Sequence, residues 1–201
     1  MKHRLIAFLL IISFTFGMAR HEASAEPFGD GLAAAERGDF ATALRLWQPL
    51  AAQGNAAAQF NLGIMYAYGK GVGQDFKEAM KWYRLAAAQG DAGAQTNLGV
   101  MYDNGQGIAQ DFKEAMKWYR LAADQGNADA QFNLGIMYDN GQGVAQDYAR
   151  AHMWFNLGAS GNSKNAASNR DNIAKIMTPA QIERAQDMAR KCQASNFKNC
   201  D

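Results

Sequence analysis

The feature that most constrains the fold is a period of 36 residues. Three near-copies of one segment begin at Ala56, Ala92 and Ala128. The first reads AAAQFNLGIMYAYGKGVGQDFKEAMKWYRLAAAQGD and the second AGAQTNLGVMYDNGQGIAQDFKEAMKWYRLAADQGN. A degenerate copy occupies residues 26–55 and keeps the same phase. Self-similarity at this spacing is typical of proteins whose repeated units stack on one another.

Each unit is predicted to contain two helices. The first covers residues 56–68 in the first full copy and is followed by glycines, which break a helix. The second covers residues 76–89, with Asp75 as its N-cap. Glu78 lies three residues after Asp75, which predicts a capping-box-like pair. Gly90 then ends the helix, because glycine readily adopts the left-handed conformation.

The apolar positions of these helices predict how the units pack. Phe76, Ala79 and Tyr83 recur at helical spacing and form one apolar face. One helix pair cannot bury that face alone, so neighbouring pairs must stack. Small residues at Ala58 and Gly63 allow the helices to approach closely. We predict an all-α protein, an α-solenoid built as a right-handed superhelix of antiparallel helix pairs. The second helices are expected to wedge a tryptophan between neighbours: Trp82, Trp118 and Trp154.

The repeated pattern A-x-x-x-L-G-x-x-Y-x-x-G-x-G-V-x-x-D-x-x-x-A-x-x-W-Y-x-x-A-A-x-x-G resembles the Sel1-like repeat, a relative of the tetratricopeptide repeat. The resemblance covers units at residues 56–91, 92–127 and 128–162, and residues 26–55 more weakly. It implies an adaptor or scaffold that holds other proteins on the concave face of the solenoid.

The first 25 residues have the layout of a secretory signal peptide. Lys2 and Arg4 precede an apolar run from Leu5 to Met18, and Ala23-Ser24-Ala25 is a typical cleavage site. The apolar run is shorter than the roughly 20 residues that a membrane-spanning helix needs. We therefore expect cleavage after Ala25, no membrane span in the mature chain, and export to the periplasm, with release outside the cell as an alternative.

Residues 163–201 depart from the repeat and are expected to form capping helices. The segment TPAQIERAQDMARKC carries a clear start signal, with Thr178 as N-cap, Pro179 at the first helical position and Gln181 completing a capping box. A polar final helix suits a cap that shields the open end of a stack.

Cys192 and Cys200 are the only two cysteines, and an oxidising compartment favours one disulfide between them. In a continuous helix their Cα atoms would lie about 12 Å apart, at ~1.5 Å per residue. A disulfide needs roughly 7 Å or less. The sequence thus predicts that the helix ends near Gln193 and that the following residues double back.

Charge and histidine content exclude several classes of function. Without residues 1–25 the chain carries 17 basic and 18 acidic side chains, so no basic surface for a nucleic-acid partner is expected. His152 is then the only histidine, and it occupies the position of Met80 and Met116 in the earlier units. We interpret it as a packed helix residue. No metal site, cofactor or catalytic residue is predicted.

Three short motifs suggest chemistry and are better explained as loops. Ser195 to Lys198 matches the S-x-x-K element of penicillin-recognising enzymes, but no S-D-N or K-T-G follows and the motif lies between two cysteines. The DNGQG runs at Asp103 and Asp139 lack the spaced ligands of a calcium loop. In YGKGVGQD, Lys70 is replaced by glutamine in the later copies, which argues against a phosphate site and favours a hinge between two helices.

The remaining candidate is a surface on the first helices. In a right-handed stack these helices line the concave face. The side of each that faces away from the packed residues combines asparagine with aliphatic residues, a set suited to an extended or helical peptide. Alternatively, these residues pack between repeats or reflect recent duplication. The predicted partner-binding residues are Phe60, Asn61, Ile64, Tyr68, Thr96, Asn97, Val100, Asp103, Asn104, Phe132, Asn133, Ile136, Asp139 and Asn140.

The leading hypothesis for function is a non-catalytic periplasmic adaptor or regulatory module that binds a protein or peptide in the cell envelope. One alternative is a cell-wall or β-lactam-directed hydrolase, because some cysteine-rich Sel1-like proteins have been associated with β-lactams. The repeats here lack the cysteine pair of that subgroup. A second alternative is a secreted factor that binds host proteins.

Overall fold

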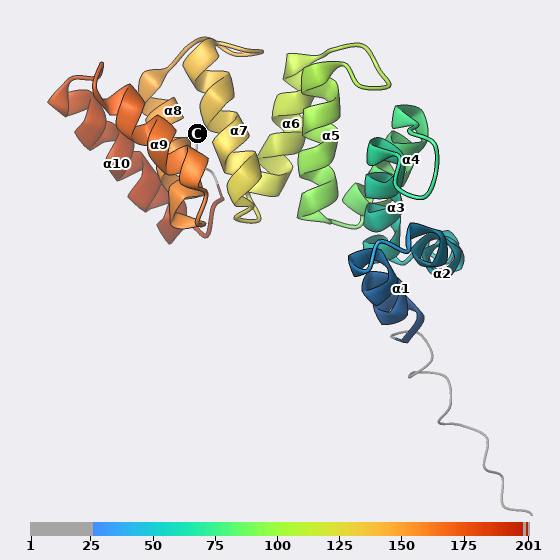
Figure 1. The fold of residues 1–201 in the computed structure, drawn as a ribbon. Helices are drawn as coiled ribbons and strands as arrows, with labels where there is room; N and C mark the ends of the chain where they lie inside the picture. The colour runs from blue at the N-terminus through green and yellow to red at the C-terminus, as the bar shows by residue number, and fades with distance from the viewer. Residues whose placement is uncertain (1–25, 199, 201) are drawn as a thin grey trace, which may run out of the picture.

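The computed structural model describes residues 26–198 and 200, and in this part of the chain it contains ten α-helices and no strand. The helices stack as a curved row of antiparallel pairs (Figure 1). The expected signal peptide lies outside the described residues. None of the ten helices is long and apolar enough to cross a membrane. The helices are α1 (Glu26–Glu36), α2 (Phe40–Ala52), α3 (Ala56–Tyr68), α4 (Phe76–Ala88), α5 (Ala92–Asn104), α6 (Phe112–Ala123), α7 (Ala128–Asn140), α8 (Tyr148–Ser160), α9 (Lys164–Ala174) and α10 (Pro179–Ala194).

Side-chain caps begin the repeated helices, as the sequence predicts for the second helix of each unit. The Asp75 carboxylate accepts hydrogen bonds from the backbone N–H groups of Lys77 and Glu78, at 2.9 and 3.0 Å. The reciprocal half of the predicted capping box is absent. The Asp75 N–H donates instead to the Tyr66 carbonyl at 2.9 Å, and the Glu78 carboxylate pairs with Lys81. The cap therefore ties α4 back to α3.

A glycine in each first helix sets how closely the two helices of a pair approach. A Cβ added to Gly63 would lie 2.4 Å from the Tyr83 ring, and one on Gly99 would lie 2.5 Å from the Tyr119 ring. In the third unit Phe155 replaces the tyrosine, and a Cβ on Gly135 would lie 2.4 Å from its ring. Any larger residue would push the pair apart, because the aromatic ring occupies that space.

The G-x-G loop between the two helices of a unit touches the preceding unit. Gly71 has φ +71°, and a Cβ there would lie 2.7 Å from the Phe40 Cβ and 2.9 Å from its carbonyl carbon. The Lys70 ammonium lies 5.5 Å from the centre of the Phe40 ring. The hinge interpretation is thus incomplete, since the second glycine also makes an inter-repeat contact. The same contact recurs at Gly107 on Phe76 and at Gly143 on Phe112.

The core is divided into three clusters along the stack. The N-terminal cluster surrounds Trp47, the middle cluster surrounds Tyr83, and the largest surrounds Trp154 and includes the cap. Trp154 is fully buried, as the wedge prediction requires. Trp82 and Trp118 are only half-buried and lie against the N-terminal and middle clusters. The array thus has a chain of local cores in place of one central core.

The C-terminal end contains the predicted capping box and the predicted disulfide. Thr178 and Gln181 form a complete capping box at the start of α10. The helix ends at Ala194, and Asn196 and Phe197 then take positive φ values, which reverse the chain. A disulfide joins Cys192 and Cys200, whose Cα atoms lie 4.7 Å apart. The reversal also brings Phe197 against Gly126, in the turn between α6 and α7.

Candidate binding surface

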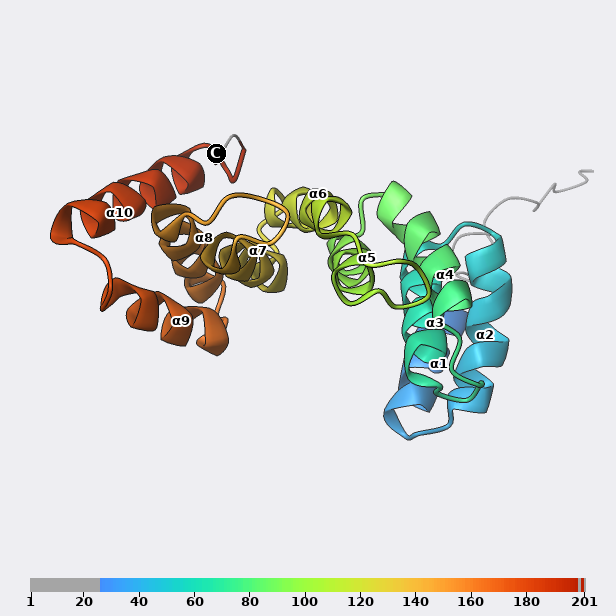
Figure 2. The ribbon, with the colours of Figure 1, turned by 90° about the horizontal axis from the view of Figure 1, so that it is seen from above.

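The first helices of the repeats form the inner side of the curved stack. Seen from above, α5 and α7 lie on the inner side of the bend and α6 lies on the outer side (Figure 2). α3 also contacts α5 directly, and α7 contacts α9. This closer approach is expected of helices on the inner side of a bend.

The apolar members of the predicted surface serve partly to join the repeats. Phe60 and Ile64 are half-buried and pack against the middle cluster. Phe60 lies 6.1 Å from the Tyr83 ring, measured between ring centres. Val100, Phe132 and Ile136 pack in the same way against the C-terminal cluster. The sequence left open whether these residues pack between repeats, and Phe60 does, because a Cβ added to Gly93 of the next unit would lie 3.0 Å from its ring.

Thr96 does not belong to an exposed surface. Its side chain is buried, and its hydroxyl Oγ1 hydrogen-bonds the Ala92 carbonyl at 2.8 Å and lies 3.2 Å from the Asn127 Oδ1. The helical wheel placed Thr96 with Phe60 and Phe132. A threonine is shorter than phenylalanine, so it stays buried and donates to Asn127, the N-cap of α7.

The asparagines remain accessible to different degrees. Asn61, Asn97 and Asn133 are half-buried, and the Asn61 amide donates to the Ala57 carbonyl at 2.8 Å. Asn104 and Asn140, at the ends of α5 and α7, are exposed. At the equivalent end of α3 stands Tyr68, whose side chain is 69% exposed. These ends provide the most accessible part of the predicted surface.

The two predicted acidic residues are half-buried and differ in their partners. The Tyr119 hydroxyl donates to the Asp103 carboxylate at 3.3 Å. Burial raises the pKa of Asp103, and this hydrogen bond partly opposes the shift. Burial also raises the pKa of Asp139. At the position of Tyr119 the third unit has Phe155, which carries no hydroxyl.

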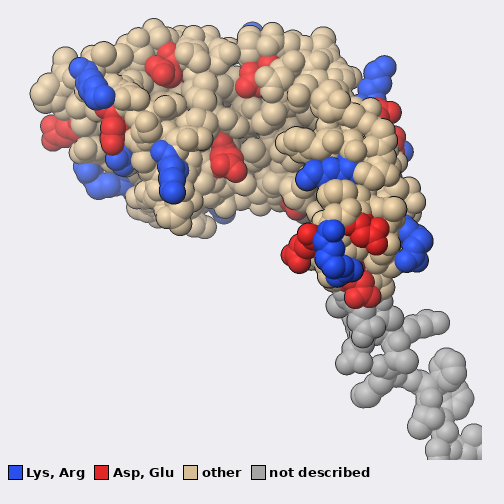
Figure 3. All heavy atoms as spheres, in the orientation of Figure 1, with Lys and Arg blue, Asp and Glu red and all other residues tan. Residues whose placement is uncertain are grey.

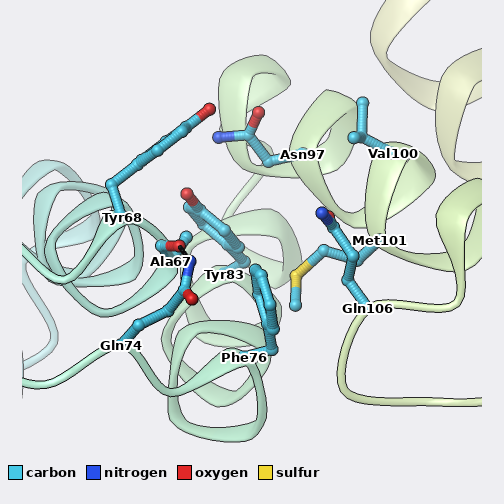
Figure 4. A pocket seen from close by; sticks show the side chains of 9 residues that line it. All are labelled: Ala67, Tyr68, Gln74, Phe76, Tyr83, Asn97, Val100, Met101 and Gln106. Carbon is cyan, nitrogen blue, oxygen red and sulfur yellow. Dashed lines mark hydrogen bonds between the residues drawn. The ribbon is translucent and has the colours of Figure 1, made fainter.

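A cavity of about 160 Å³ opens between the first two full repeats. Its walls include Tyr68 from α3, Phe76 and Tyr83 from α4, and Asn97 and Val100 from α5. The polar ends of Tyr68, Tyr83 and Asn97 point toward one another (Figure 4). The structure thus brings together three of the residues predicted from the sequence, Tyr68, Asn97 and Val100.

Sequence reasoning missed the other lining residues because it assigned Tyr83 and Phe76 to the packed face. Tyr83 is indeed buried, yet its hydroxyl end reaches the cavity (Figure 4). A signal was available in the repeat alignment. Ala67 and Tyr68 stand where the next two copies both have Asp-Asn, so this interface was bound to differ.

Charged groups are sparse on the inner side. Lysine, arginine, aspartate and glutamate lie scattered over the face that contains α5 and α7, with uncharged surface between them (Figure 3). The residues that line the cavity are all uncharged. The described residues hold no group of three or more His, Cys, Asp or Glu side chains able to bind a metal ion. The surface is suited to hydrogen bonding and apolar contact.

The residues of the hydrolase alternative are not arranged for that chemistry. Ser195 follows the end of α10, and its hydroxyl bonds the carbonyls of Cys192, at 2.8 Å, and of Lys198. Lys198 is exposed, whereas the S-x-x-K mechanism uses a buried lysine on a rigid helix. His152 is buried, which also fits its interpretation as a packed residue.

The repeat is shared with a known family. A sequence profile of the Sel1 repeat matches residues 28–55, 56–91, 92–127 and 128–163. The chain belongs to the Sel1 repeat family. Sel1 repeat proteins generally act as scaffolds for protein–protein interaction.

Two solved structures of Sel1 repeat proteins resemble the chain. A Sel1 repeat protein from Oxalobacter formigenes is 34% identical over 73% of this chain, with a TM-score of 0.68. A protective antigen present in uropathogenic Escherichia coli strains, which displays the same repeat fold, is 27% identical over 87% of this chain, with a TM-score of 0.60. The chain spans 58% and 47% of these two proteins. No curated protein matches it in sequence.

Proposed function

We propose that this Sel1 repeat protein is a non-catalytic adaptor of the cell envelope, which binds a protein or peptide on the inner side of its stack. The observation that carries the proposal is the run of polar and aromatic groups at the ends of α3, α5 and α7, beside a cavity between two repeats. Half-buried asparagine amides can donate to and accept from a peptide backbone, and the neighbouring aliphatic groups exclude water.

The helix framework supports this role because it needs no rearrangement to present the surface. Glycine–aromatic contacts fix each helix pair, and the G-x-G loops fix each pair against the preceding one. A preformed surface loses little conformational entropy on binding.

The test is capture of a partner from an envelope extract by the chain that begins at Glu26, with mass spectrometry to identify what is bound. The Asn97→Ala/Asn133→Ala variant removes two half-buried amides of the inner helices. We expect it to recover at least several-fold less partner, with an unchanged helical circular-dichroism signal. The matched control is Lys77→Ala/Lys113→Ala, which alters exposed side chains on the second helices α4 and α6. Equal recovery by both double variants would contradict an inner binding surface.

The envelope location rests on the sequence of residues 1–25 and has its own test. Expression of the full chain in a Gram-negative host should yield a protein that starts at Glu26 in the periplasmic fraction. Retention of Met1 in the cytoplasmic fraction would overturn the location and leave the binding surface in place. Recovery from the medium would favour a factor that acts outside the cell.

A further inference from the structure

The interface between the second and third full repeats has nearly the same residues as the interface that contains the cavity. The positions that line the cavity are filled by the same residue types in the second interface: Tyr83 by Tyr119, Asn97 by Asn133, Phe76 by Phe112 and Gln106 by Gln142. The differences on α3 are Ala67 and Tyr68, which the second interface replaces with Asp103 and Asn104. A third lining position also differs, because Ile136 stands in the second interface where Val100 lines the first cavity.

Ala67 provides no carboxylate to the hydroxyl of Tyr83, whereas Asp103, at the equivalent position, lies beside the hydroxyl of Tyr119. In the second interface the Asp103 carboxylate takes the Tyr119 hydroxyl. In the first, the Tyr83 hydroxyl faces the Asn97 amide and the Tyr68 hydroxyl across the cavity (Figure 4). Burial raises the pKa of Tyr83, so this hydroxyl remains protonated and neutral at physiological pH.

The size and polarity of the cavity limit what can fill it. Its volume is about 160 Å³. An apolar protein cavity of roughly 150 Å³ accepts a benzene ring, so one aromatic ring is a suitable occupant. Aromatic residues and Val100 provide the apolar walls, and the three polar ends meet at one side. A charged side chain would be left without a counter-ion there, which is costly.

We propose that the cavity is a specificity pocket for the phenol ring of a tyrosine in the bound peptide. The proposal rests on the proposed function and adds the chemistry of the partner's anchor. The ring would pack between Tyr68 and the apolar wall, and its hydroxyl would join the hydrogen-bonding group formed by Tyr83 and Asn97. Aromatic anchors in pockets commonly dominate the affinity of such interfaces.

The first experiment titrates the chain with N-acetyl-tyrosinamide and follows amide chemical shifts by NMR. We expect saturable shifts around Tyr68, Tyr83 and Asn97, with a dissociation constant on the order of millimolar for so small a ligand. N-acetyl-phenylalaninamide should bind about five-fold more weakly, because one hydrogen bond contributes about 1 kcal/mol. N-acetyl-lysinamide should give no saturable shift. If the tyrosine amide shows no saturable binding at concentrations up to about ten times the expected dissociation constant, the proposed pocket is wrong.

Two variants exchange the lining residues that differ between the two interfaces. Each new residue already occurs at the equivalent position of another repeat, so the variants are expected to fold. Ala67→Asp copies the residue of the later repeats, so the fold is expected to persist, and the carboxylate should fill the space and take the Tyr83 hydroxyl. It should abolish binding of the tyrosine amide. Asp103→Ala/Asn104→Tyr/Ile136→Val copies all three differing residues of the first interface and should create a second site beside Tyr119. Retained binding in Ala67→Asp would contradict the proposal.

A third variant tests the hydroxyl alone. Tyr83→Phe keeps the ring that packs on Gly63 and removes only the oxygen. It should erase the preference for the tyrosine amide over the phenylalanine amide. A preference that persists in Tyr83→Phe would contradict the assigned contact. Failure of the pocket can be told from failure of the binding surface, because Asn97→Ala/Asn133→Ala would still reduce partner capture when only the pocket is wrong.

Discussion

The second helices α6 and α8 occupy the same position in neighbouring repeats and have very different surroundings. α6 has four buried residues and α8 has eight. Leu121 on α6 is 48% exposed, whereas Leu157, its equivalent on α8, is 1% exposed. Trp118 is half-buried and Trp154 is fully buried. The sequence repeat alone does not determine how deep a residue lies.

The cause of this difference is the C-terminal cap. Both α9 and α10 contact α8, and Ile173 of α9, Ala185 of α10 and Met177 of the turn between them belong to the same core cluster. On the other side, the Arg120 guanidinium of α6 lies 5.0 Å from the centre of the Trp154 ring. Among the described helices, α6 packs chiefly against α5 and α7. In a stacked array the neighbours set the burial of each position, and the last repeat has α9 and α10 as neighbours in place of another repeat.

The largest expected effect compares the two tryptophans. Trp154→Ala should lower the free energy of unfolding by about 3–5 kcal/mol, the usual cost of removing a large buried aromatic side chain. Trp118→Ala should cost about half as much, because the side chain keeps part of its contact with water in the folded protein. Urea unfolding followed by circular dichroism measures both. Equal losses would show that the cap does not account for the difference in burial.

The disulfide tests the cap itself. Replacing both Cys192 and Cys200 with alanine should cost about 2–3 kcal/mol, the value expected for releasing a short loop. The release should be felt in α8 and not in α6. Hydrogen exchange should therefore accelerate in α8 and stay unchanged in α6, and treatment of the unmodified chain with a reductant should reproduce the effect. Faster exchange in both helices would mean that the cap supports the whole array.

His152 of α8 is expected to make the stability of the folded chain depend on pH, whereas Met116, its equivalent on α6, does not titrate. Burial, and then the Arg170 charge, lower the pKa of His152, while Asp171 opposes the shift. Because the folded pKa is lowered, stability from the neutral imidazole is complete above the ordinary value of about 6.5 and is lost as the pH falls below it. We expect the unmodified chain to lose stability between pH 7.5 and pH 5. His152→Met, which copies Met116 of α6, should lose much less over the same range in thermal melts.

The smallest expected effect concerns the acids that face these helices. Tyr119 of α6 donates to Asp103, whereas Phe155 of α8 cannot donate to Asp139. Burial raises the pKa of Asp139, so its ionised form at pH 7 destabilises the folded state, and protonation relieves this as the pH falls. Asp139→Asn should raise the stability at pH 7 by less than about 0.5 kcal/mol, and the gain should vanish near pH 3. Asp103→Asn should gain less, because it weakens a hydrogen bond. Paired melting curves at the two pH values measure the difference.

The repeat predicted much of the fold because local and periodic signals agree. The first helix of each unit begins at Ala56, Ala92 and Ala128, as the 36-residue phase requires, and Gly69 ends α3 with φ +65°. The reversal after α10 followed from the distance that the disulfide must span. The half-formed capping box at Asp75 could not be predicted, because the competing acceptor, the Tyr66 carbonyl, lies nine residues earlier.

The candidate site was predicted less completely, and for a physical reason. A helical wheel gives the direction of a side chain but not the position of the next helix pair. Thr96 is therefore buried, and the apolar half of the predicted surface packs against the core clusters. Tyr83 was assigned to the core, although its length allows one end to be packed and the other to reach a cavity. A residue of this kind is misassigned when each position is classified as either core or surface.

The contact between each G-x-G loop and the preceding unit has a consequence for how such a chain can change in length. Gly107 lies against the carbonyl group and Cβ of Phe76, and Gly143 lies against the same atoms of Phe112, so each unit offers the same docking edge to its successor. An extra 36-residue unit inside the array would form the existing loop–phenylalanine contact with both of its neighbours, so no new type of interface would be needed. A duplication that included α9 and α10 would end the stack. Duplication of single units can thus lengthen the inner surface while α9 and α10 still cover the last repeat.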